Sequence, residues 1–183
     1  IENKGNSNIE VFPYRLIKRI NTPDTINFFI LHEGFISLIN DELLEKNYDD
    51  IADDCNSSMP SKKEFCDNKA KGGWLGFTDK YWMSALIPDA DQSINVNYRY
   101  GNNGRDSYRA GYVGQIYKVS SGERLEYGGK LFVGAKKLNV LSAYDEKLSI
   151  PRFTDAIDWG WFSFLTKPVS YAINWFFGYA GNF

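Results

Sequence analysis

The segment Ile94-Asn95-Val96-Asn97-Tyr98-Arg99-Tyr100 decides the fold class of this 183-residue chain. Apolar or aromatic residues alternate with Asn and Arg along it, and a period of two is typical of a strand with one buried face. The turn-forming residues Asn102-Asn103-Gly104 follow at once. The segment therefore predicts a strand in a sheet with a core face and a solvent face.

Other segments repeat this pattern and predict a mainly β chain. Residues 81–87 alternate in the same way, as do residues 125–133, where the pattern puts Leu131 and Val133 on the buried face. Short strands separated by turns favour an antiparallel sandwich or barrel over βαβ units. Four upstream segments are also interpreted as strands: 9–20, where Pro13 indicates an edge or a bulge, 26–32, 35–39 and 43–51.

Composition limits the class of protein. The length fits one domain or one domain with an appendage. The net charge of −2 argues against a nucleic-acid binder, so no nucleic-acid partner is expected. One histidine and two cysteines exclude zinc fingers and disulfide-rich scaffolds. The first residue is Ile1 and no signal segment follows it, so the chain is expected to be a piece of a longer protein.

The strand pattern stops at residues 52–71, which are predicted to form a long surface loop because they are rich in charged and small polar residues. Both cysteines, Cys55 and Cys66, lie in this segment. In an oxidising compartment they could close a ring that stabilises the fold by roughly 2–3 kcal/mol. Two free thiols are the alternative.

The C-terminal part changes to helical spacing. Residues 135–150 predict a short amphipathic helix, and residues 154–183 predict an amphipathic helical segment that Pro168 kinks or divides. Trp and Tyr are frequent here, and these residues favour the bilayer–water boundary. A helix lying in a membrane interface is the main interpretation, and a helix packed on its own domain is the alternative. The candidate interface residues are Trp159, Trp161, Phe164, Leu165, Lys167, Val169, Ile173, Trp175, Phe176 and Phe177, with Lys167 near the headgroups.

Catalytic and metal-binding patterns are weak. The alternating polar residues Asp89, Asp91, Ser93, Asn95 and Asn97 begin like a calcium loop, but the required glycine and bidentate glutamate are missing. His32 has no recognisable partner for acid–base chemistry, and no Ser or Cys has a nucleophile signature. We therefore expect no catalytic residue, no metal and no cofactor.

Charge is unevenly distributed along the chain. Residues 40–70 hold nine acidic and four basic side chains, a net −5, whereas residues 99–130 hold six basic and three acidic ones, a net +3. The two segments could form opposed faces of a protein–protein surface, and a solvated surface is the alternative.

Several motifs resemble those of the YidC family of membrane protein insertases. They are Lys71-Gly72-Gly73-Trp74-Leu75-Gly76-Phe77, Lys80-Tyr81-Trp82-Met83-Ser84-Ala85-Leu86-Ile87-Pro88, Gly129-Lys130-Leu131-Phe132-Val133-Gly134-Ala135-Lys136, Ala156-Ile157-Asp158-Trp159-Gly160-Trp161-Phe162 and Phe164-Leu165-Thr166-Lys167-Pro168. The last two are the most specific. The resemblance covers at least residues 35–183.

The resemblance implies a fold, a location and partners. The first periplasmic domain of that family is an antiparallel β-supersandwich similar to galactose mutarotase, truncated here at its N-terminus. The expected organisation is a sandwich over 1–134, a short helix over 135–150, and an interfacial segment over 154–183 that leads to a missing transmembrane helix. The implied function is non-catalytic support of membrane protein insertion on the periplasmic side of the bacterial inner membrane. The implied partners are the membrane surface, the Sec translocon components SecD, SecF and SecYEG, and client membrane proteins.

The mutarotase-like fold also leaves a second hypothesis, a carbohydrate-binding or sugar-epimerising domain. Exposed Trp and Tyr side chains could stack on sugars. Fold alone does not carry function, and epimerisation requires an acid and a base that the sequence does not supply.

Overall fold

The computed structural model describes residues 1–24, 31–56, 58, 66–160 and 162–181. Its elements, in chain order, are β1 (Ile9–Val11), β2 (Tyr14–Ile20), β3 (Gly34–Ile39), β4 (Glu42–Asn47), α1 (Tyr48–Asp54), β5 (Asp67–Lys71), β6 (Trp74–Thr78), β7 (Trp82–Ile87), β8 (Ser93–Asn102), β9 (Asp106–Gly114), β10 (Tyr117–Val119), β11 (Lys130–Ala135), α3 (Leu138–Leu148), the 3-10 helix η1 (Phe153–Ala156) and α4 (Ser163–Ala180).

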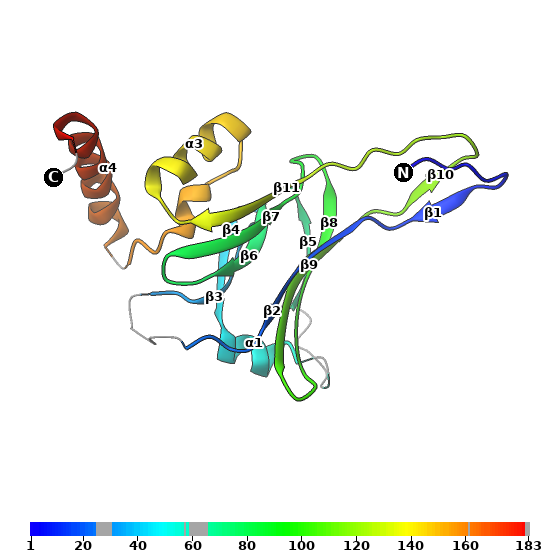
Figure 1. Cartoon of the computed structure of the whole chain (residues 1–183), viewed down its shortest axis with the longest axis horizontal. Helices are drawn as coiled ribbons and strands as arrows, with labels where there is room; N and C mark the ends of the chain where they lie inside the picture. Colours follow the sequence, from blue (N-terminus) through cyan, green and yellow to red (C-terminus); the bar gives the residue numbers. More distant parts are fainter. Residues whose placement is uncertain (25–30, 57, 59–65, 161, 182–183) are drawn as a thin grey trace.

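Two antiparallel sheets form a sandwich (Figure 1). The five-stranded sheet has the order β11-β7-β6-β3-β4, and the four-stranded sheet has the order β2-β9-β8-β5. Strand β2 contacts β7 across the interface, and β9 contacts β6. The prediction of a mainly β, antiparallel sandwich with C-terminal helices is confirmed.

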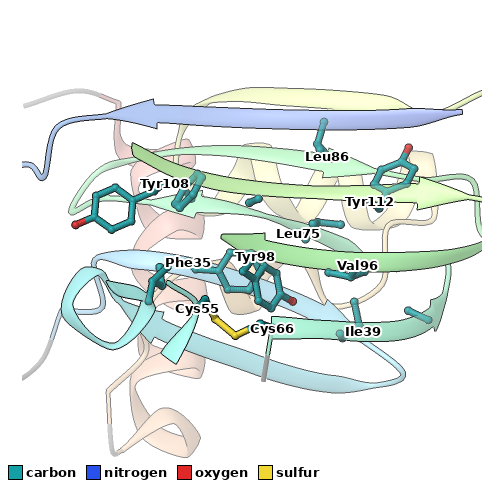
Figure 2. Close-up of a cluster of buried hydrophobic side chains, with 14 of the residues drawn as sticks. Phe35, Ile39, Cys55, Cys66, Leu75, Leu86, Val96, Tyr98, Tyr108 and Tyr112 are labelled. Atoms are coloured by element: carbon teal, nitrogen blue, oxygen red, sulfur yellow. A yellow bond between two sulfur atoms is a disulfide. The ribbon is translucent and has the colours of Figure 1, made fainter. Parts of the chain in front are cut away.

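The main core lies between the two sheets. Tyr98 and Phe35 approach to 3.7 Å between ring centroids, and both rings are buried (Figure 2). Val96 of β8 and Tyr112 of β9 lie in the same layer. The alternation read from residues 94–100 therefore has a physical cause, since one face of β8 meets the opposite sheet and the other meets water.

A second core lies on the far face of the five-stranded sheet, where α3 and η1 cover it. Trp74 of β6 is fully buried there, packs edge-on against Phe153 at 5.4 Å, and donates its indole N–H to the Pro151 carbonyl. Leu141 of α3 is also fully buried. Strands β3 and β6 of this sheet are thus buried on both faces, and the packed domain continues to Ala156, beyond the boundary expected at residue 134.

A two-stranded arm projects from the sandwich at the end opposite α4 (Figure 1). It pairs β1 with β10, and Asn3 holds its far end because the buried Asn3 amide donates to the carbonyls of Ser7 and Val119. The prediction of a single strand over residues 9–20 is wrong. Pro13 has no N–H for a ladder, and the chain divides there into β1 of the arm and β2 of the sandwich.

The segment around the cysteines also differs from expectation. The strand predicted over 43–51 ends at Asn47, whose side chain caps α1 by accepting from the Asp50 amide at 2.8 Å. The predicted loop over 52–71 instead contains the end of α1 and strand β5, which pairs with β8. The strand predicted over 26–32 falls largely on residues 25–30, outside the described residues, and Leu31 and His32 are not in a strand.

A disulfide joins Cys55, at the end of α1, to Cys66, just before β5 (Figure 2). The Cα atoms are 5.7 Å apart, and both residues are buried in the core between the sheets. The two ends of the segment, at Cys55 and Cys66, are therefore packed in the core.

The direction of side chains on β11 is the reverse of the expectation. The strand begins only at Lys130, Phe132 is buried against Phe153 of η1, and Leu131 and Val133 are 63% and 70% exposed. Two features cause this difference. Helix α3 and η1 cover the Phe132 face, whereas β11 is an edge strand beyond β7, and β2, which contacts β7, is the edge of the facing sheet.

Candidate membrane-interface helix

Helix α4 is the part of the described chain that packs least. It begins at Ser163 and continues through Pro168 to Ala180 as one helix, so Pro168 does not divide it. No α4 residue is buried. The helix stands apart from the sandwich at one end of the molecule (Figure 1).

The polar side of α4 is the side that faces the domain. Ser163, Lys167, Ser170 and Asn174 recur at helical spacing on one side. The least exposed residues of the helix are Thr166, Lys167 and Ser170, all half-buried. A helix that packs on its own domain turns its apolar stripe inward. Helix α4 does the opposite.

An ion-pair network attaches the first turns of α4 to η1. Lys167 Nζ lies 2.6 Å from Asp155 Oδ1, and Arg152 Nε lies 2.8 Å from Asp155 Oδ2. Burial alone would raise the pKa of Asp155, but the hydrogen bonds from Lys167 and Arg152 outweigh it, so this pKa is lowered. The carboxylate therefore stays ionised and holds both cations at neutral pH.

Trp159 belongs to this attachment rather than to the exposed apolar surface. Its indole N–H donates to the Thr154 carbonyl at 3.0 Å, and the Lys167 ammonium lies 5.6 Å from the ring centroid. The Thr166 hydroxyl donates to the Trp159 carbonyl at 2.7 Å. Lys167 is thus engaged with Asp155 and Trp159, and a contact with lipid headgroups would require that pair to open.

The remaining described candidates form a broad set of exposed apolar side chains outside the contact with η1. Phe164 is 76% exposed and Tyr179 is 85% exposed. The other exposed apolar side chains are Phe162, Leu165, Val169, Tyr171, Ile173, Trp175, Phe176 and Phe177. We call this set, with Phe164 and Tyr179, the apolar face of α4. Trp161 lies outside the described residues. A large group of exposed apolar side chains on a protein surface marks an interaction site.

The candidate residues named from the sequence include most of this exposed set, but they omit Phe162, Tyr171 and Tyr179, and the sequence did not reveal the attachment. The spacing of Arg152 and Asp155 is a weak signal for an i,i+3 pair. Nothing in the sequence indicated that Lys167 would reach the same carboxylate.

Among the described residues, none of the helices is long and apolar enough to cross a bilayer. At about 1.5 Å per residue, the 18 residues of α4 are roughly 27 Å long.

His32, the only imidazole, has structural contacts. Its Nε2 lies 2.7 Å from the Phe35 carbonyl oxygen, and its backbone N–H donates to Asp158. These contacts join the start of β3 to the segment that precedes α4.

Comparison with known proteins gives one consistent result. The family model described as the YidC periplasmic domain matches residues 1–172. A membrane protein insertase YidC from Rhizobium johnstonii is 37% identical over 184 residues, covering 100% of this chain and 29% of the relative. The corresponding protein of Rickettsia canadensis is 39% identical over 186 residues, covering 100% of this chain and 31% of the relative. The chain therefore spans under a third of the length of these curated relatives.

Proposed function

Because the chain belongs to the family of YidC periplasmic domains, we propose that it forms the periplasmic domain of an inner-membrane protein insertase. In this role the sandwich is a folded platform without catalytic activity, and it supports insertion and folding of client membrane proteins by contacting partners. Components of the Sec translocon, including SecD, SecF and SecYEG, are the partners that the family resemblance suggests. Helix α4 couples the platform to the membrane surface.

The disulfide supports the periplasmic location. Disulfides persist in oxidising compartments and are rare in the cytosol. The Cys55–Cys66 bond is buried in the main core, so it contributes to the fold rather than to exposed thiol chemistry.

The apolar face of α4 carries the proposal of membrane coupling. Burying each such side chain in the interface gives roughly 1.5–3 kcal/mol before ordering costs. The Lys167–Asp155 pair fixes the polar side of the helix toward the domain, which leaves the apolar face available to lipid. Since α4 carries one cation and that cation is paired, attachment rests on apolar burial more than on anionic headgroups.

Liposome co-sedimentation tests this coupling. We compare the full chain with a chain that ends at Gly160, which keeps η1 and Trp159 in place. We expect the full chain to sediment with both neutral and anionic vesicles and the shortened chain to stay in the supernatant. Thermal unfolding of the shortened chain is the control for folding. Equal sedimentation of the two chains, or none of either, would contradict the proposal.

The contacts that the His32 side chain makes argue against a sugar-epimerising function. Its Nε2 is engaged with a backbone carbonyl, and no described carboxylate is hydrogen-bonded to its ring. Isothermal titration with hexoses and oligosaccharides would revive this alternative if heat were observed at millimolar ligand.

A further inference from the structure

Three cations lie side by side on the outer face of the four-stranded sheet. Lys18 of β2 is directly opposite Arg109 of β9, and Arg109 is directly opposite Arg99 of β8. Adjacent strands are about 4.8 Å apart, and residues directly opposite project to the same face. Their neighbours Tyr98 and Tyr108 are buried, so the three cations lie on the face away from the core.

Only one of these three charges is balanced within the described part of the chain. Arg99 is held by both carboxylate oxygens of Asp67 at 2.7 Å. No described carboxylate forms an ion pair with Lys18, Arg109 or the nearby Arg105. In addition, the Nε of Arg109 is buried and has no hydrogen-bond partner there. A buried, charged donor without a partner is unfavourable, and like charges directly opposite on neighbouring strands are destabilising.

The surface around these cations is hollowed. A depression of about 460 Å³ is lined by Lys18, Arg105 and Arg109 together with Ile20 of β2 and Ser107 of β9. None of the described lining residues is acidic. The depression therefore offers positive charge, hydroxyl and amide groups, and one apolar side chain at a place where the fold itself gains nothing from the charges.

We propose that this depression binds an acidic segment of a partner protein, with carboxylates meeting Lys18, Arg105 and Arg109. Charge complementarity selects an anionic occupant, because a carboxylate supplies a counter-charge to cations that have none within the described residues. The apolar surface alongside favours a polypeptide over an isolated anion, since Tyr14, Leu16 and Ile20 follow the same outer face of β2 and are all exposed. This surface does not involve α4, so the proposal can be tested independently of membrane coupling.

A labelled peptide, fluorescein-Glu-Leu-Glu-Ser-Glu-Leu-Glu, is the probe for the full chain. We expect fluorescence anisotropy to report binding that weakens as salt rises. Lys18→Gln and Arg109→Gln should each weaken binding about tenfold, the change expected for losing one charge-assisted contact. Lys118→Gln removes an exposed cation from the arm and is the matched control, with an expected change below about twofold. Unchanged binding in the two test variants would overturn the proposal.

Two further measurements separate this proposal from other roles of the cations. Thermal unfolding of Lys18→Gln and Arg109→Gln should occur at the same or a higher temperature than that of the unmodified chain, because like-charge repulsion is relieved. A lower unfolding temperature in both would assign the cations to folding and overturn the proposal. Sedimentation with phosphatidylglycerol vesicles should be equal for the test and control variants. A selective loss in the test variants, without peptide binding, would make this a lipid-facing surface instead.

Discussion

Trp74 in the sandwich and Trp175 in α4 carry the same indole ring, but Trp74 is fully buried and Trp175 is 62% exposed. The Trp74 side chain projects from β6 and is enclosed between the five-stranded sheet and η1. Trp175 lies on a helix whose polar side already faces the domain. The two regions contain similar apolar side chains, and what differs is whether this chain supplies the surface that covers them. Substitutions should therefore affect stability in the sandwich and membrane binding in α4.

The largest effect should come from the core. Trp74→Ala removes a fully buried side chain and its hydrogen bond to Pro151, so the free energy of unfolding should fall by about 3–5 kcal/mol. Denaturant unfolding followed by circular dichroism measures this. Trp175→Ala is the matched control, and its unfolding free energy should stay within about 0.5 kcal/mol. Similar losses in both variants would remove the distinction between the two regions.

Removing the disulfide should give the next largest effect. The double substitution Cys55→Ser and Cys66→Ser opens a ring closed over 11 positions, and the unfolding free energy should fall by about 3 kcal/mol. Reductant should destabilise the unmodified chain by a similar amount and leave the double variant unchanged. An unmodified chain indifferent to reductant would argue that the bond contributes little.

Charges on the apolar face of α4 should act on membrane binding alone. Ile173→Asp and Phe176→Asp each remove a side chain worth about 2 kcal/mol of interfacial burial, so vesicle partitioning should fall by at least about 30-fold for each. Asn174→Asp, which adds the same charge on the polar side, is the control and should reduce partitioning far less. A change in unfolding temperature with Ile173→Asp would indicate that this face packs on the domain in solution.

The smallest effect should come from the attachment of α4. Asp155→Asn removes the carboxylate that holds Lys167 and Arg152, and it should cost about 1 kcal/mol. Because the pKa of Asp155 is lowered, this stabilisation is complete above the unfolded-state value near 4 and is lost as pH falls through the folded-state value. Tryptophan fluorescence of the unmodified chain should therefore shift on acidification below about pH 4, and the shift should be smaller in Asp155→Asn. Equal shifts in the two chains would assign the change to other groups.

The accuracy of the sequence analysis depended on whether a feature is set by the local pattern or by the packing of distant segments. Strand β8 was predicted correctly because one of its faces meets water, so its alternation survives in the sequence. Strand β11 was predicted with the wrong face inward, since Leu131, Phe132 and Val133 are all apolar and only the positions of α3 and η1 decide which is covered. The apolar face of α4 could be predicted from helical spacing. Its attachment through Asp155 could not, because that contact depends on where η1 packs.

The position of the disulfide has a consequence for biosynthesis. Cys55 and Cys66 are 11 residues apart, and both precede β6, β7, β8 and β9 in the chain. Closing so short a ring costs little loop entropy even in an unfolded polypeptide. If the domain is exported as proposed, oxidation can occur as soon as Cys66 has emerged, before β8, the strand that pairs with β5, has followed. The covalent link would then present α1 and the start of β5 as a preassembled corner to strands that arrive later.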